Sequence, residues 1–233
     1  MINPNDNVMI GLSGGKDSLV LTLALAVLKK RSPITFNLHA CIIDHSDGAT
    51  DTGKIKEFMN ELEIPLNVIL HPTFKIIQDR EERSPCSLCS NLRRGILASK
   101  ANEIGCNVIA LGHNKDDVIE TVLLNLFYTG QFKCFHPNLY MSRTDVRAIR
   151  PLIYVEENNI SCEANRLNLP VTNITCGYSE TSKRKSAKKI LSLLEDFAPD
   201  IKSNVMHALK NVKNCDTWMH TVLNNTSAES DLK

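Results

Sequence analysis

The sequence predicts an α/β fold, with a doubly wound parallel sheet and a helical extension at the C-terminal end. Short apolar runs alternate with longer helical patterns through the first half of the chain. A turn with two adjacent glycines joins the first strand to the first helix. After the first half, the clearest patterns are helical. Such alternation indicates parallel strands, whose carboxyl ends form the edge at which ligands bind.

The first half supplies the predicted strands and the helices between them. Apolar runs predict strands at 8–12, 36–44, 66–70 and 107–111, and helices at 17–31 and 51–63. The helix at 17–31 is apolar on nearly every side and ends in Lys29, Lys30 and Arg31, as expected of a buried helix with cations at its C-terminus. Another helix opens after residue 113, with one apolar face formed by Ile119, Val122, Leu123, Leu126 and Phe127.

The second half gives weaker strand signals. A loop is predicted over 131–147 and another over 170–178. Helices are expected at 156–167, 180–197 and 200–219, followed by a frayed end at 224–233. We therefore expect one domain over residues 1–178 and a helical extension over 179–233 that packs on the same domain.

Composition places the chain among ordinary globular proteins. Of its 233 residues, 42% are hydrophobic and 23% are charged, and the net charge is +1, so any basic surface for nucleic acid must be local. No apolar stretch is long enough to span a bilayer and residues 1–6 do not resemble a leader, so a cytoplasmic protein with no membrane contact is expected. In the reducing cytoplasm, the eight cysteines of the chain do not predict a disulfide framework. Cys41 and Cys106 are expected in the core.

The glycine-rich turn (residues 13–18, S-G-G-K-D-S) is the first strong functional signal. The backbone amides of residues 13–15, at a helix N-terminus, would face an anion, and the helix dipole favours negative charge there. Lys16 adds a cation, Asp17 a carboxylate for a metal and Ser18 a hydroxyl. The spacing differs from a Walker phosphate loop and resembles the signature of the ATP pyrophosphatases. An ordinary turn is the competing interpretation.

Polar residues also follow two other predicted strands. Asp44 ends the second strand, and Gly112 and His113 follow the fourth. Because the carboxyl ends of parallel strands meet at one edge, these residues are expected near the glycine-rich turn. Asp44 would touch ribose or adenine there, unless it belongs to an ordinary polar loop.

The helix after His113 has a strong N-terminal signal. Asn114 suits the N-cap, and Asp116 and Asp117 favour the positive end of the helix dipole. This structural role applies in part whatever the function of these residues.

Cys86 and Cys89 form a C-x-x-C pair. Two thiols at i and i+3 on a helix can ligate one metal centre, and Arg93 lies on about the same face. The pair alone leaves four alternatives: half of a zinc site, a redox dithiol, part of an iron–sulfur cluster, or no function. A third thiol, Cys176, is available in the predicted late loop.

Together these motifs resemble the tRNA 2-thiocytidine synthetase family. They occur in the family's order: the turn at 13–18, P-C-S-L-C-S-N-L-R-R-G at 85–95, L-G-H-N-K-D-D at 111–117 and I-R-P-L-I at 149–153. The resemblance implies a PP-loop ATP pyrophosphatase domain of the adenine nucleotide alpha hydrolase-like fold. It also implies a tRNA sulfurtransferase reaction, in which ATP adenylates the C2 oxygen of an anticodon-loop cytidine (position 32 in the family) and sulfur displaces AMP.

The resemblance also implies residue roles, cofactors and partners. The cofactors would be ATP, Mg²⁺ and a [4Fe-4S] cluster, with the cluster on Cys86, Cys89 and Cys176 and one iron open to the transferred sulfur. Catalytic roles would belong to Lys16, Asp17, His113 and Asp117. Nucleotide would be bound by Ser13, Gly14, Gly15, Lys16, Asp17, Ser18, Asp44, Gly112 and His113. The partners would be tRNA, a sulfur donor (a cysteine desulfurase or sulfide) and a second copy in a homodimer.

Other functions stay open at this point. A tRNA 2-thiouridine synthetase of the same superfamily shares the chemistry but usually carries additional zinc-binding cysteine pairs. Lysidine synthetase shares the turn but has no use for a C-x-x-C pair, whereas a non-catalytic ATP-binding redox sensor would use it as a switch. Separately, Lys185, Lys188 and Lys189 share a helical face that either contacts the tRNA backbone or is simply solvated.

Overall fold

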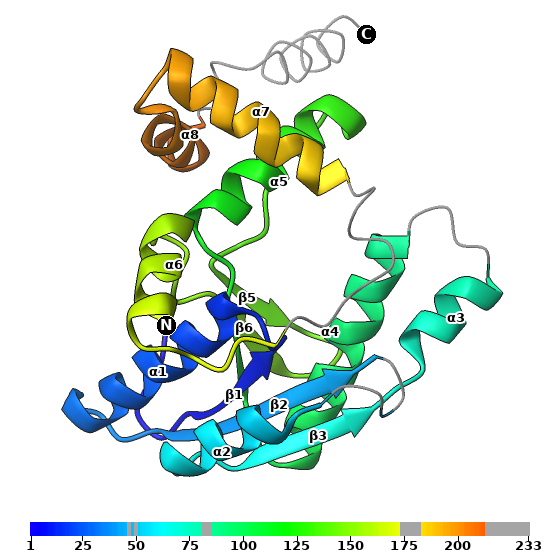
Figure 1. The fold of residues 1–233 in the computed structure, drawn as a ribbon, viewed down its shortest axis with the longest axis vertical. Coiled ribbons are helices and arrows are strands. Elements are labelled where there is room, and N and C mark those ends of the chain that lie inside the picture. The colour runs from blue at the N-terminus through cyan, green and yellow to red at the C-terminus, as the bar shows by residue number, and fades with distance from the viewer. Residues whose placement is uncertain (46–47, 49–50, 81–84, 173–182, 213–233) are drawn as a thin grey trace, which may run out of the picture.

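A computed structural model describes residues 1–45, 48, 51–80, 85–172 and 183–212. Within these residues a six-stranded sheet has the order β3-β2-β1-β4-β6-β5 (Figure 1). The strands are β1 (Asn7–Leu12), β2 (Asn37–Asp44), β3 (Leu66–Leu70), β4 (Val108–Leu111), β5 (Asn138–Met141) and β6 (Val146–Ile149). Neighbouring strands are parallel except β5 and β6. The predicted doubly wound parallel sheet is confirmed, with an antiparallel strand at one edge.

Helices cover both faces of this sheet (Figure 1). The described helices are α1 (Lys16–Arg31), α2 (Gly53–Glu61), α3 (Thr73–Asp79), α4 (Pro85–Glu103), α5 (Lys115–Thr129), α6 (Glu157–Arg166), α7 (Lys183–Phe197) and α8 (Ile201–Lys210). Side chains of β1 alternate between two cores, because successive residues of a strand point to opposite faces. Val8 and Ile10 pack with α1, α2 and α6, whereas Met9 packs with α4.

The predicted loop over 131–147 is wrong, because β5 and the start of β6 lie within it. Each of these strands has four residues, so each offers only two side chains per face, too few for a periodic signal. Val146 and Ile149 are nevertheless completely buried. The turn between the strands includes Asp145 at φ 53°, a left-handed conformation that Asp tolerates better than most residues.

The C-terminal helices pack on α5. Figure 1 shows α7 lying across α5, with α8 beside it. A small apolar cluster joins the three helices, with Ile119, Leu123 and Leu191 buried at its centre. The predicted helix at 200–219 is too long, because α8 ends at Lys210 with Asn211 as its C-cap. Residues 213–233, including the predicted frayed end, lie outside the described part of the chain.

Two cysteines belong to the core. Cys41 and Cys106 are buried in the cluster between the sheet and α4, as predicted. Burial disfavours a thiolate and raises the pKa of each thiol to about 11, so both are inert nucleophiles at neutral pH. In the described residues, no helix has both the length and the apolar character needed to cross a membrane.

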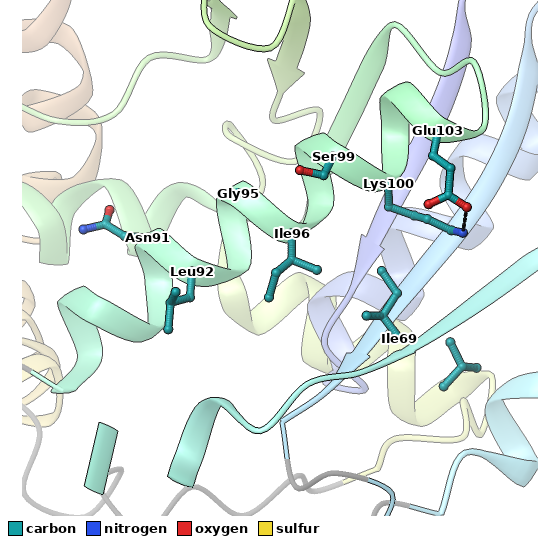
Figure 2. Close-up of a pocket in the computed structure, with 9 residues that line it drawn as sticks. Ile69, Asn91, Leu92, Gly95, Ile96, Ser99, Lys100 and Glu103 are labelled. Atoms are coloured by element: carbon teal, nitrogen blue, oxygen red, sulfur yellow. Dashed lines mark hydrogen bonds and ion pairs between the residues drawn. The ribbon is translucent and has the colours of Figure 1, made fainter. Parts of the chain in front are cut away.

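A groove runs along the outer side of α4, next to the edge strand β3. Figure 2 shows Ile69 facing Ile96 across it, with the Lys100–Glu103 ion pair at one end. Its lining is Val68, Ile69, Asn91, Leu92, Gly95, Ile96, Ser99, Lys100 and Glu103. The lining includes none of the site residues predicted from the sequence.

Candidate active site

The glycine-rich turn leaves the N-terminus of α1 without a side-chain cap. Its N-cap is Gly15 in an extended conformation, which offers no capping side chain to the amides that follow, and the Gly15 amide itself donates to Ser13 Oγ at 3.4 Å. Gly14 has φ 75°, a left-handed conformation that glycine adopts without strain. The first backbone amides of α1 therefore keep their capacity to bind an anion.

Ser13 and Ser18 brace the turn from within. The Ser18 hydroxyl donates to the Gly15 carbonyl at 2.9 Å and accepts from the Ser13 amide at 3.2 Å. The two serine hydroxyl oxygens are 3.3 Å apart. Both hydroxyls thus stabilise the conformation of the turn. The sequence predicted nucleotide binding for these serines and did not reveal this structural role.

Gly112 packs directly against the first turn of α1. A Cβ at this position would lie 3.1 Å from the backbone carbon and oxygen of Asp17 and from the Ser18 nitrogen. This glycine therefore allows the end of β4 to touch the glycine-rich turn. Its predicted place beside the turn is confirmed by this contact, and its role toward nucleotide remains a prediction.

Lys16 is held by two carboxylates. Its Nζ lies 2.8 Å from Glu157 Oε1 and 3.2 Å from Asp17 Oδ2. The other oxygen of Glu157 pairs with Lys188 at 2.6 Å. Burial lowers the pKa of Lys16, but the hydrogen bond to Glu157 and the two negative charges outweigh burial, so the pKa lies above its usual value. Lys16 is a cation at all physiological pH values.

Asn114 links α5 to α1. Its side chain accepts from the Asp117 amide at 3.0 Å, and the Asp117 carboxylate accepts from the Asn114 amide at 3.0 Å, forming a capping box. The Asn114 Nδ2 also donates to Asp17 Oδ1 at 3.0 Å. Asp17 and Asp117, which lie far apart in the sequence, are thereby brought to one site.

Asp116 is directed elsewhere. It accepts from the backbone amide of Glu157 at 2.8 Å and pairs with Lys202 of α8 at 2.6 Å. It therefore joins α5 to α6 and α8, a structural role.

Arg184 of α7 lies over the acidic side of α5. Its guanidinium is 3.3 Å from Asp117 Oδ1 and 3.2 Å from Glu120 Oε2. Burial raises the pKa of Asp117 and raises that of Glu120 to about 7, although Arg184 opposes both shifts. With Lys188 on Glu157, two basic residues of α7 thus face the site, and Lys188 is not simply part of an outward-facing stripe.

His113 is half-buried among cationic groups. Arg150 Nε donates to His113 Nδ1 at 3.2 Å, and the Phe135 ring lies against the imidazole with 4.8 Å between centroids. Burial, aided by the charges of Arg150, Arg184, Arg93 and Arg94, lowers the pKa of His113 to about 3. The imidazole is therefore neutral at physiological pH.

Asp44 is buried at the carboxyl end of β2. One of its oxygens accepts from the Gly48 amide at 2.9 Å, so it shapes the loop that follows. Neighbouring His45 bonds Thr73 Oγ1 through Nδ1 at 2.8 Å, at the start of α3. Asp44 thus lies at the predicted edge of the sheet, and its contact with ribose or adenine remains a prediction.

Cys86 and Cys89 lie at the beginning of α4, with Cys86 exposed and Cys89 half-buried. Cys176 is outside the described residues. Four residues before it, however, the Thr172 amide donates to the Gly14 carbonyl at 2.9 Å. The described residues contain no group of three or more His, Cys, Asp or Glu side chains arranged for a metal.

Residues 2–172 match the model of a PP-loop domain family. The tRNA-cytidine(32) 2-sulfurtransferase of Pelobacter propionicus is 38% identical over 216 residues, which cover 91% of this chain and 80% of that protein. The enzyme of the same name from Alkalilimnicola ehrlichii is also 38% identical, with 91% and 69% coverage. The chain belongs to the tRNA-cytidine(32) 2-sulfurtransferase family.

A solved structure extends this relationship within the PP-loop fold. The U34-tRNA thiolase NcsA from Methanococcus maripaludis, described with its [4Fe-4S] cluster, superposes with a TM-score of 0.73 at 28% identity. The alignment covers 91% of this sulfurtransferase-family chain and 74% of that thiolase. The predicted family and fold are confirmed.

Sequence reasoning missed the roles of Glu157, Arg150 and Arg184. Arg150 belongs to the I-R-P-L-I segment, so the motif itself carried a signal. Arg184 lies in a basic segment that gives no signal of a carboxylate partner, and Glu157 had no local signal because its partners lie on other helices.

Proposed function

We propose that this protein is an ATP-dependent tRNA sulfurtransferase that adenylates the C2 oxygen of a cytidine, position 32 of tRNA, and replaces it by sulfur. The proposal is carried by one observation, the hydrogen bond from Thr172 to Gly14, together with family membership. Because a chain spans at most about 3.6 Å per residue, Cys176 is within roughly 14 Å of Thr172. We infer that this short connection allows the late thiol to approach the glycine-rich turn.

The ATP site is built from the glycine-rich turn. The uncapped amides of α1 would receive a phosphate, and Lys16 would move from Glu157 to the phosphates. Pyrophosphate leaves more readily when these groups neutralise the charge that develops on it. Asp44 and Gly112 border the same edge of the sheet and would contact the nucleoside.

Asp17 and Asp117 would hold Mg²⁺. Carboxylate oxygens are suitable ligands, and Asn114 brings the two carboxylates together through the bonds described above. Since the described residues offer no third ligand, phosphate oxygens and water would complete the coordination.

Cys86, Cys89 and Cys176 would hold a [4Fe-4S] cluster. The exposure of Cys86 and the C-x-x-C spacing fit such a group, whose ligands are thiolates. When bound with three protein ligands, the cluster offers an open iron to a sulfur atom. Arg93 follows Cys89 by one helical turn, and its positive charge favours the thiolate there.

Further elements of the proposal concern partners and organisation. The substrate is tRNA, the sulfur donor is a cysteine desulfurase or sulfide, and the protein acts in the cytoplasm as a homodimer. The division into residues 1–178 and 179–233 also remains a prediction.

Nucleoside mass spectrometry tests the function. Unmodified tRNA, ATP, Mg²⁺, a reductant and sulfide are incubated with the anaerobically purified protein, and 2-thiocytidine is expected. Lys16→Ala should abolish both AMP formation and thiolation, whereas Lys29→Ala at the far end of α1 should retain both. If 2-thiouridine forms instead, the assignment of cytidine as the substrate base is wrong. The protein would then share the uridine specificity that is named for the solved thiolase. If neither nucleoside forms although ATP binds, the redox sensor becomes the better description.

A further inference from the structure

Arg150 makes three contacts, one with the His113 ring and two with groups near it. Its Nε donates to His113 Nδ1, Nη1 donates to the His136 carbonyl, and Cζ lies 4.7 Å from the centre of the Phe135 ring. Arg150 directly follows β6 and is only 5% exposed. Its planar guanidinium is therefore fixed in direction, and so is the hydrogen bond to the imidazole.

This hydrogen bond determines where the proton of His113 lies. Guanidinium nitrogens only donate, so His113 Nδ1 must accept and cannot carry a proton. A neutral imidazole then carries its proton on Nε2. No partner for Nε2 is found within the described part of the chain.

Protonation of both ring nitrogens is opposed by the surroundings. An imidazolium would direct an N–H group at the Arg150 donor. Its positive charge would also be repelled by four arginines. These are Arg150, Arg184 and the adjacent pair Arg93 and Arg94 on α4. Burial adds to these repulsions, so the neutral ring is strongly preferred.

We propose that Arg150 is a positioning residue that holds His113 as the Nε2–H tautomer, so that His113 donates a hydrogen bond to the bound nucleotide and does not accept a proton. The proposal rests on the proposed function and on the nucleotide-binding role that the family resemblance implies for His113. A neutral donor suits a phosphate oxygen on which charge develops as pyrophosphate leaves. Proton removal during the reaction then belongs to another group.

Nuclear magnetic resonance of the full chain with ring-¹⁵N-labelled histidine tests the tautomer directly. Comparison with His113→Gln identifies the His113 signals among those of the seven histidines. In the unsubstituted protein we expect the Nε2–H pattern, without protonation, from about pH 5.5 to 8.5. In Arg150→Met we expect a mixture of the two neutral tautomers. We also expect His113 to become protonated at a higher pH, closer to that of an ordinary histidine.

Two variants sharpen this test. Arg147→Met is the matched control, because Arg147 lies on β6, the strand that Arg150 follows, and pairs with Asp6 at 2.6 Å but does not touch His113. It should leave the His113 signals unchanged. Arg150→Lys keeps the charge without the planar donor, so it should give mixed tautomers without protonation, and it serves if Arg150→Met does not fold.

An Nδ1–H pattern in the unsubstituted protein, or protonation of His113 within that pH range, would overturn the proposal. A folded Arg150→Met or Arg150→Lys protein that keeps the pure Nε2–H form would overturn it as well. These measurements need neither ATP nor tRNA. A failure of tRNA thiolation is therefore distinguishable from a failure of this inference.

Discussion

Lys16 and Glu157 form an ion pair beside the glycine-rich turn, with 2.8 Å between Nζ and Oε1. The pair joins the first turn of α1 to the first turn of α6, and Lys188 of α7 completes it from the other side. The cation needed for phosphate is thus neutralised by protein carboxylates. Nucleotide must compete with Glu157 for it.

Glu157→Gln should strengthen ATP binding. Removal of this carboxylate releases Lys16 and removes a negative charge that repels the phosphates, worth about 1 kcal/mol, or roughly three- to tenfold in Kd. Calorimetric titration with a non-hydrolysable ATP analogue and Mg²⁺ measures the change. Glu156→Gln is the control, because Glu156 pairs with Lys115 and not with Lys16. Weaker binding in Glu157→Gln would show that the nucleotide or its metal needs this carboxylate.

Gly112→Ala should damage the ATP site more than the fold. The new Cβ would press on backbone atoms of Asp17 and Ser18, which cannot rotate away as a side chain can. We expect a stability loss of about 1–3 kcal/mol and ATP binding weakened at least about tenfold. Denaturant titration and calorimetry measure the two effects.

Gly95→Ala provides the comparison for this substitution. Gly95 lies in α4, and nothing is within 4 Å of a Cβ there. Alanine should stabilise the helix by about 0.5–1 kcal/mol, since it removes a glycine from a helix interior. Equal ATP affinity in both glycine variants would mean that the Gly112 contact does not shape the site.

Lys202→Met should destabilise the packing of α8. Lys202 is buried and pairs with Asp116 at 2.6 Å and with Glu195 at 2.8 Å, so its removal leaves the buried Asp116 carboxylate without a cation. The expected loss is about 3 kcal/mol in the free energy of unfolding by urea. Arg166→Met, which breaks the exposed pair with Glu163, should cost no more than about 1 kcal/mol. Similar losses in both variants would argue against burial as the cause.

Glu120→Gln should change how stability depends on pH. The folded pKa of Glu120 is about 7, above its ordinary value of 4.5, so the folded protein binds more protons than the unfolded chain between those values. Stability contributed by the protonated carboxyl is therefore lost as the pH rises from about 4.5 to 7. Without this group, the free energy of unfolding should fall less over that interval. A curve parallel to that of the unsubstituted protein would contradict the raised pKa.

Cys176→Ala should abolish the cluster and preserve the fold. Loss of one of three thiolate ligands leaves only the Cys86–Cys89 pair, which holds a cluster poorly. Iron analysis and the visible spectrum after anaerobic purification measure occupancy, and circular dichroism measures folding. Cys162→Ala is the control, because Cys162 is an exposed cysteine on α6. Full iron content in Cys176→Ala would show that another residue is the third ligand.

The sheet and the glycine-rich turn were predictable because their signals are local. Apolar runs bounded by glycine or polar residues mark β1 and β2, and the turn's letters lie between a strand and a helix. The β5–β6 hairpin escaped prediction because strands of four residues carry little periodicity. The burial of β6 depends on its neighbour β4, which lies too far away in the sequence to contribute to a local pattern.

The ionic contacts of the site were much less predictable. Arg184 and Lys188 lie in a basic segment, and sequence alone suggests that such residues face water or RNA. Their carboxylate partners are on α5 and α6, so only the packed helices reveal the pairs. His113 was identified from its strand end, but its tautomer depends on Arg150, which follows a strand that was not predicted.

The small apolar cluster between α5, α7 and α8 has a dynamic consequence. Among the residues that the structure describes, it contains three buried side chains, whereas the two cores against the sheet contain many more. Segments with few buried apolar contacts open locally at a lower free energy than the global transition. Amide hydrogens of α7 and α8 should consequently exchange sooner than those of β1. Because α7 supplies Arg184 and Lys188, such opening would bare the carboxylates beside the turn while the sheet stays intact.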